Sequence, residues 1–175
     1  MTNIGDKVIY KASGICTVEE LCKQSIPDSG SREKSDCYLL RPLSDPAIKI
    51  YVPLSNEVLM AQIRPILTPE QMLALIEQVS DLSMEWIEEM RARTLAFRDV
   101  LGSGDRMRLC AMIKLLYERR EALTKQGKKL YAADETALKK AEKLLFEEAA
   151  FVLEMSCEDI SHLFLSKVLP QELTV

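Results

Sequence analysis

The sequence has 175 residues, of which 47% are hydrophobic and 29% are charged, with a formal net charge of −4. This length fits one large domain or two small ones, and the composition excludes wholesale disorder. Uncharged apolar stretches fall far short of the about 20 residues that a membrane span needs. The first six residues also lack the basic and apolar regions of a signal peptide, so we expect a cytoplasmic protein.

The first 66 residues predict a small, strongly bent antiparallel sheet or barrel. Short runs rich in β-branched and aromatic residues are separated by turn residues such as Gly14 and the Pro27-Asp-Ser-Gly-Ser31 stretch. The predicted strands cover residues 6–10, 15–21, 37–43 and 48–52. In the last run, alternation places Ile48, Ile50 and Val52 on the core face and leaves Lys49 and Tyr51 outside.

From residue 67 onward the sequence predicts about five helices, so the fold class is α+β. Thr68, with Pro69 and Gln71, forms a capping box for the first helix. A second helix is expected from about Ser83, a third after the Gly102-Ser-Gly-Asp105 stretch, a fourth capped by Asp134 and a fifth capped by Ser156. The second shows apolar residues at 3-4-3-4 spacing, typical of one core-facing stripe: Ile87, Met90, Thr94, Phe97 and Leu101.

Charge is segregated along the chain. Residues 1–67 carry eight basic and eight acidic side chains, and residues 68–90 carry six acidic and no basic ones. Residues 91–143 carry fourteen basic and seven acidic side chains, a net charge of +7, and residues 144–175 carry one basic and six acidic ones. Such a block is most often a solvated helical surface, but a basic centre is also the electrostatic footprint of phosphate binding.

Cysteine and histidine usage argues against metal, cofactor and catalytic sites. The five cysteines include no Cys-x-x-Cys pair, and His162 is the only histidine. We therefore expect reduced thiols acting as small buried hydrophobic groups, no structural metal and no functional disulfide. The sequence also has no nucleophile–base pair and no phosphate-binding loop, so we expect no enzyme activity. The cysteines are Cys16, Cys22, Cys37, Cys110 and Cys157.

Trp86, the only tryptophan, falls at the border of the apolar stripe of the second predicted helix at about 100° per residue. Arg91, Arg93 and Arg98 lie on the same helix. A tryptophan at such a border is usually a core residue whose N–H binds a carbonyl group. An exposed aromatic among arginines can instead stack on or wedge beside a base. The spacing alone leaves both readings open.

An ordered series of motifs extends over nearly the whole chain and resembles the CarD/CdnL family of bacterial transcription regulators. The front domain of that family is shared with the RNA polymerase-binding module of the transcription-repair coupling factor. The matching segments are Gly5-Asp6-Lys7-Val8-Ile9-Tyr10, Gly14, Tyr38-Leu39-Leu40, Ile50-Tyr51-Val52-Pro53 and Arg64, then Trp86, Ser103-Gly104-Asp105, Gly127-Lys128-Lys129-Leu130, Asp134-Glu135, Ala141-Glu142-Lys143-Leu144-Leu145 and Glu147-Glu148.

The resemblance implies a Tudor-like barrel over residues 1–66 that binds the β subunit of RNA polymerase, and a helical domain over residues 67–175 that contacts promoter DNA. Trp86 would hold the open complex from the minor groove, with Arg91, Arg93 and Arg98 as phosphate partners of a contact that is weak alone. Lys49 and Tyr51 would face the polymerase, with Lys23 and Gln24 as further candidates by approximate alignment. A monomer is expected. The alternative is a protein–protein adaptor that never touches DNA, which the acidic residues near Trp86 favour.

Overall fold

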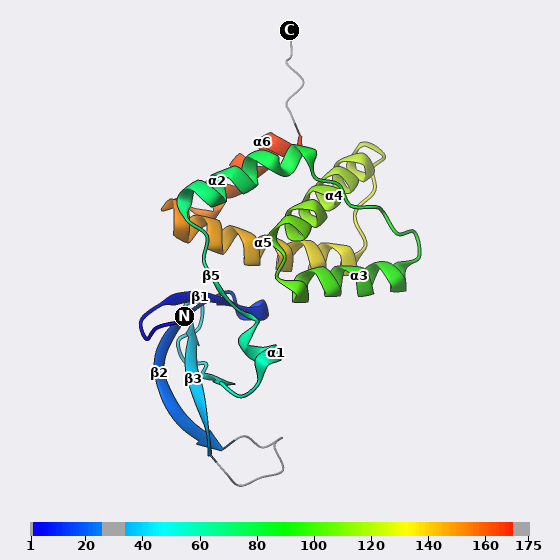
Figure 1. Cartoon of the computed structure of the whole chain (residues 1–175). Coiled ribbons are helices and arrows are strands. Elements are labelled where there is room, and N and C mark those ends of the chain that lie inside the picture. The colour runs from blue at the N-terminus through cyan, green and yellow to red at the C-terminus, as the bar shows by residue number, and fades with distance from the viewer. Residues whose placement is uncertain (1, 26–33, 170–175) are drawn as a thin grey trace. The chain divides into compact units, whose positions relative to one another are not determined.

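The computed structural model describes residues 2–25 and 34–169, so the turn predicted at residues 27–31 lies outside the described part. The chain divides into two compact units, Met1–Ile66 and Leu67–Val175 (Figure 1). The first holds every strand of the described residues and the second is helical. This is the α+β architecture that the sequence predicts, a Tudor-like β domain followed by a helical domain.

The first unit is a five-stranded antiparallel sheet. Its strands are β1 (Lys7–Tyr10), β2 (Ile15–Ser25), β3 (Lys34–Pro42), β4 (Ile50–Pro53) and β5 (Ile63–Pro65), in the order β4-β3-β2-β1-β5. The short helix α1 (Glu57–Met60) connects β4 to β5, and Lys11–Ser13 form a 3-10 turn. The core cluster on one face of the sheet consists of Val8, Tyr10, Cys16, Val18, Leu40 and Val52.

A bulge interrupts the pairing of β2 with β3, the two long strands that lie side by side in Figure 1. Val18 pairs with Leu40, but the next paired position is Glu20 with Leu39, so one residue of β2 is extra. Because directly paired residues share a face, the bulge moves Glu20 off the core face that regular alternation would give it. The extra residue, Glu19, forms an ion pair with Arg41 at 2.6 Å.

The last predicted strand begins two residues later than the sequence suggests. Ile48 is 47% exposed and lies before β4, so its expected place in the core is wrong. Asp45 holds the preceding turn, since its carboxylate accepts from the Ala47 N–H and its carbonyl accepts from the Ile48 N–H, both at 3.1 Å. Val52 is fully buried, as expected.

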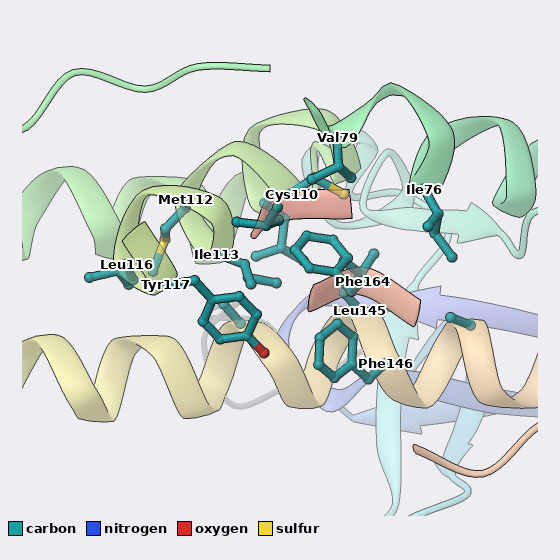
Figure 2. Close-up of a cluster of buried hydrophobic side chains, with 14 of the residues drawn as sticks. Ile76, Val79, Cys110, Met112, Ile113, Leu116, Tyr117, Leu145, Phe146 and Phe164 are labelled. Carbon is teal, nitrogen blue, oxygen red and sulfur yellow. The ribbon is translucent and has the colours of Figure 1, made fainter. Parts of the chain in front are cut away.

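The second unit contains α2 (Pro69–Glu77), the 3-10 turn η3 (Gln78–Asp81), α3 (Met90–Ser103), α4 (Arg106–Lys125), α5 (Ala132–Leu153) and α6 (Cys157–Val168). Its core draws on all of these helices. Figure 2 shows core side chains from α2, η3, α4, α5 and α6. Phe164 of α6 lies 6.0 Å from the ring of Tyr117 and 5.5 Å from that of Phe146, measured between centroids. Within the described residues, no helix is long and apolar enough to cross a membrane.

Three helix starts follow the predicted caps, and two do not. The side chains of Thr68, Asp105 and Ser156 each accept a backbone N–H of the helix they cap, and Thr68 completes the capping box with Gln71. The second predicted helix begins at Met90 rather than near Ser83, because Glu89 is its cap. The helix α5 begins at Ala132, so Asp134 lies inside its first turn and is not its cap.

The core-facing side of α3 also differs from the predicted stripe. Its buried residues are Arg93, Phe97 and Val100, whereas Met90 is 50% exposed and Thr94 is exposed. The burial of Arg93 could not be predicted from the sequence, because a prediction based on hydrophobic periodicity assigns only apolar residues to the buried side of a helix.

The five thiols differ in burial. Cys16, Cys37 and Cys110 are buried, Cys22 is half-buried and Cys157 is exposed, so the expectation of five buried thiols is wrong for Cys157. Within the described residues, no group of three His, Cys, Asp or Glu side chains could hold a metal ion.

Candidate functional site

Trp86 lies in an irregular segment, residues 82–89, between η3 and α3 rather than on a helix. Two cations hold this segment at its ends. At the first, the Lys114 ammonium donates to the carbonyl oxygens of Ser80 and Leu82 at 2.6 and 2.9 Å. At the second, Nη1 of Arg93 donates to the carbonyl oxygens of Ile87 and Glu88. Trp86 is therefore positioned by contacts to its neighbours' backbone and not by helical periodicity.

Arg93 is the cation that makes the segment's second contact, and it is buried. The side chain is 2% exposed, and its Nε and Nη2 donate to the two carboxylate oxygens of Asp134, both at 3.0 Å. Asp134 is itself 1% exposed. A guanidinium committed to a carboxylate and two carbonyl groups has no face to offer to a phosphate. The structure therefore removes Arg93 from the expected phosphate partners.

The indole ring of Trp86 is half-buried and contacts two guanidinium groups. The Arg93 Cζ lies 4.3 Å and the Arg119 Cζ 4.7 Å from the ring centroid, both within the range of cation–π attraction. The ring packs against the helical core, yet its Nε1–H is buried and has no hydrogen-bond partner among the described residues. Trp86 therefore fits neither sequence interpretation fully: it is not a free wedge, and it is not a core indole with a satisfied N–H.

Acidic residues surround the Trp86 segment, and one of them is structural. Glu85, Glu88 and Glu89 are all exposed, and Glu89 accepts from the backbone N–H groups of Arg91 and Ala92. These two bonds favour the charged carboxylate and hold the pKa of Glu89 below its usual value. Its negative charge at the start of α3 also complements the helix dipole. Part of the acidity near Trp86 thus serves to begin a helix.

Arg91 and Arg98 are both exposed on α3, on the surface rather than in the core. Arg98 and Lys140 line a hollow of about 380 Å³ between α3 and α5, with Phe97 among its apolar walls. Both arginines are accessible to a phosphate, unlike Arg93.

On the sheet, β4 is an edge strand of the described residues and pairs only with β3. Tyr51 pairs with Leu39 and Val52 with Tyr38, so Tyr51 faces away from the core cluster, in agreement with the predicted alternation. It is half-buried, while Lys49, just before the strand, is exposed.

The pairing of β2 with β3 places the two remaining candidates, Lys23 and Gln24, on opposite faces of the sheet. Gln24 pairs with Ser35 and Lys23 with Asp36, and both side chains are exposed. Ser35 and Leu39 lie on the same face of β3, so Gln24 shares a face with Tyr51, whereas Lys23 points to the opposite face. The partners of Tyr51 and Lys23 on β3 are three residues apart, which is about 10 Å along the strand. The four candidates therefore do not form one cluster.

Two residues of the site were not anticipated. Apart from the family resemblance, the sequence suggests Asp134 only as a helix cap, and it leaves Arg119 as one of the fourteen basic residues of 91–143. Asp134 lies 41 positions from Arg93, and no local spacing reveals a pair between residues so far apart. The only signal is an acid in a first helical turn, which is ordinary for any helix.

Residues 3–67 match the family model described as the CarD-like/TRCF RID domain. The matched range covers all five strands and ends at the first residue of the helical unit. A comparison with curated proteins gives no match. The family is a protein-interaction domain rather than a catalytic one, and it binds the β subunit of RNA polymerase. The chain therefore carries a CarD-like/TRCF RID domain, as the resemblance implied, and is an RNA polymerase-interacting protein.

Proposed function

We propose that this protein, whose residues 3–67 form a CarD-like/TRCF RID domain, regulates bacterial transcription from two surfaces. The β unit binds the polymerase β subunit, and the helical unit contacts promoter DNA and stabilises the open complex through Trp86. The observation that carries the proposal is the domain match. Tethering to polymerase gives the helical unit a high effective concentration at the promoter, so an acidic protein can make a weak DNA contact there. The proposed location is the cytoplasm and the proposed state is a monomer.

We place the polymerase contact at the edge strand β4. An unpaired strand edge offers backbone groups to a partner, and side chains that face away from the core give specificity. Tyr51 is such a side chain, and Lys49 adds an exposed positive charge beside it. Gln24 shares the face of Tyr51 and is a weaker candidate, and the register argues against Lys23 on that face.

A pull-down with the isolated β-subunit lobe tests this contact. Tyr51→Ala combined with Lys49→Glu is expected to weaken binding about thirtyfold or more, because a hot-spot aromatic contributes about 2 kcal/mol or more. Circular dichroism should stay unchanged. Lys143→Glu, an exposed charge reversal on α5, is the control and should bind as the wild type does. Binding of the double variant at wild-type strength would exclude β4 as the contact.

The DNA contact requires the Trp86 ring to leave its present position, where it packs against the helical core. Leaving breaks two cation–π contacts, worth roughly 0.5–2 kcal/mol each. It also releases a buried N–H that has no partner, which costs roughly 1–3 kcal/mol while it stays buried. A base that stacks on the freed ring contributes about 1–3 kcal/mol. That is enough to shift an open–closed promoter equilibrium about five- to a hundredfold.

Open-complex lifetime measured with Trp86→Ala tests this contact. The variant is expected to shorten the lifetime about tenfold with polymerase bound normally, because one stacking contact is lost. Arg91→Ala and Arg98→Ala should each lower the salt slope of DNA association by about one unit. Urea unfolding of Trp86→Ala is the control for folding. A lifetime equal to that of the wild type would refute the wedge.

A second candidate function is a polymerase-binding adaptor without DNA contact. The specific observations in its favour are the burial of Arg93 and the two guanidinium groups over Trp86. Footprinting separates the two functions: an adaptor leaves the upstream edge of the bubble unprotected even when polymerase is present, whereas the wedge protects it.

A further inference from the structure

A second pocket of about 380 Å³ opens beside Trp86, among α4, the turn that follows it, and the start of α5. Its volume lies within the range of small-ligand sites. The turn is fixed by Gly127, which adopts a φ of +70°, and by the Lys128 N–H, which donates to the Leu123 carbonyl at 2.8 Å. The pocket is thus built on two helices and a defined turn.

The walls of this pocket combine aromatic surface with positive charge. Trp86, Tyr131 and Leu130 supply the apolar part, and Tyr131 is 67% exposed. Arg119, Lys128 and Lys129 are the pocket's cations.

The cations of the pocket lack the ion pairs that several other basic side chains of the helical unit form. Arg106 is paired with Glu148, Arg108 with Asp99 and Lys167 with Glu77. Among the described residues, neither Arg119 nor the lysines at 128 and 129 has a carboxylate partner.

The pocket has one acidic residue, and its charge is already neutralised. Asp134 lines the wall, but both its carboxylate oxygens accept from Arg93. The electrostatic character of the pocket is therefore set by its three unpaired cations. A pocket of this kind attracts a ligand that carries negative charge and a flat ring.

We propose that this pocket binds a nucleoside phosphate, with the base against Tyr131 and the exposed part of Trp86 and the phosphate against Lys128 and Lys129. The nucleotide can come from free solution or from a single DNA strand, since both present the same chemistry. The free-nucleotide source is independent of polymerase. The DNA source rests on the proposed nearness of the helical unit to promoter DNA, and not on the wedge, in which the Trp86 ring leaves this position.

Because Trp86 is the only tryptophan of the chain, its fluorescence reports on this pocket directly. The full-length protein is titrated separately with ATP, GTP, AMP, adenosine, tripolyphosphate and a short single-stranded oligodeoxynucleotide. Saturable quenching by nucleotides is expected, stronger than with adenosine or tripolyphosphate. In Lys128→Ala/Lys129→Ala the dissociation constant should rise about tenfold, since charge-assisted contacts to phosphate are lost.

Lys139→Ala/Lys143→Ala removes the same charge from exposed positions of α5 outside the pocket and is expected to bind as the wild type does. Tyr131→Ala should reduce the difference between ATP and tripolyphosphate, because it removes base stacking but no cation. Quenching by mononucleotides supports the free source, and quenching by the oligonucleotide alone supports the DNA source.

Three results would overturn the proposal: no quenching by any probe, equal affinity for tripolyphosphate and ATP, or unchanged affinity in the variant lacking both pocket lysines. The titration contains no polymerase or promoter, so its failure is distinct from a failure of the open-complex assay.

Discussion

The buried pair of Arg93 and Asp134 makes a sharp test of how the helical unit is held together. Both side chains are at most 2% exposed, and the guanidinium donates four hydrogen bonds, two of them to backbone carbonyl groups of the Trp86 segment. Asp134→Ala leaves a buried cation without its counterion. Breaking a buried pair in this way costs roughly 3–5 kcal/mol of unfolding free energy, a large part of the 5–15 kcal/mol typical of a domain.

Replacing both partners should cost much less than replacing one. In Arg93→Met/Asp134→Leu no charge is left unpaired, and apolar side chains of similar size fill the space. The carbonyl oxygens of Ile87 and Glu88 lose their donor, but these residues are partly or fully exposed, so water can replace it. We expect the double variant to be more stable than Asp134→Ala by about 2 kcal/mol or more.

Urea unfolding followed by circular dichroism measures these free energies. Asp99→Ala is the matched control, because it breaks the exposed pair of Arg108 and Asp99 and should cost roughly 0–1 kcal/mol. In the double variant the Trp86 emission should also shift, since its segment has lost an anchor. A cost below about 1 kcal/mol for Asp134→Ala, or a double variant as unstable as the sum of its singles, refutes the reasoning.

Three further predictions concern local features. The pKa of Glu89 is lowered by two backbone bonds, so its contribution to stability is present at neutral pH and lost as the pH falls below about 4.3. Glu89→Ala should therefore flatten the acid side of the pH–stability curve measured by urea midpoints, and an unchanged curve would contradict its capping role. Burial raises the pKa of Cys16 to about 11 and that of Cys110 to about 12, so iodoacetamide should modify the exposed Cys157 first; mass spectrometry showing Cys110 modified as fast would contradict this. Thr68→Ala should cost about 1 kcal/mol in thermal or urea unfolding, and no loss would mean that the capping box is not needed.

Those parts of the fold that depend on neighbours in sequence could be predicted. Thr68, Asp105 and Ser156 each bind backbone N–H groups two or three residues ahead, so the cap and its partner appear together in the sequence. The outward direction of Tyr51 follows from strict alternation in a strand. The predicted start of β4 at Ile48 was wrong, because a turn held by Asp45 precedes the strand and includes residues that have strand propensity.

The start of α3 could not be predicted, because its cause lies far away in sequence. The carbonyl oxygens of Ile87 and Glu88 accept from Arg93, and Arg93 is held in place by Asp134 on another helix. The two carbonyl groups before Glu89 therefore accept hydrogen bonds from the Arg93 side chain, a donor that is in place only in the folded structure. The position of Trp86 depends on this arrangement, so its helical placement was wrong. Of the three arginines expected near it, Arg93 contacts its ring, and the second guanidinium on the ring is the unanticipated Arg119.

The bulge in β2 limits how this chain can change in length. Deleting Glu19 would join Val18 directly to Glu20, and their partners Leu40 and Leu39 are already consecutive on β3, so every following residue would keep its partner and its face. The loss would be the ion pair of Glu19 with Arg41 and the local twist that the bulge adds. Deleting a residue between Glu20 and Lys23 would instead move Lys23 and Gln24 by one position against β3 and exchange their faces of the sheet. A one-residue deletion in β2 should thus be far better tolerated at the bulge than beyond it.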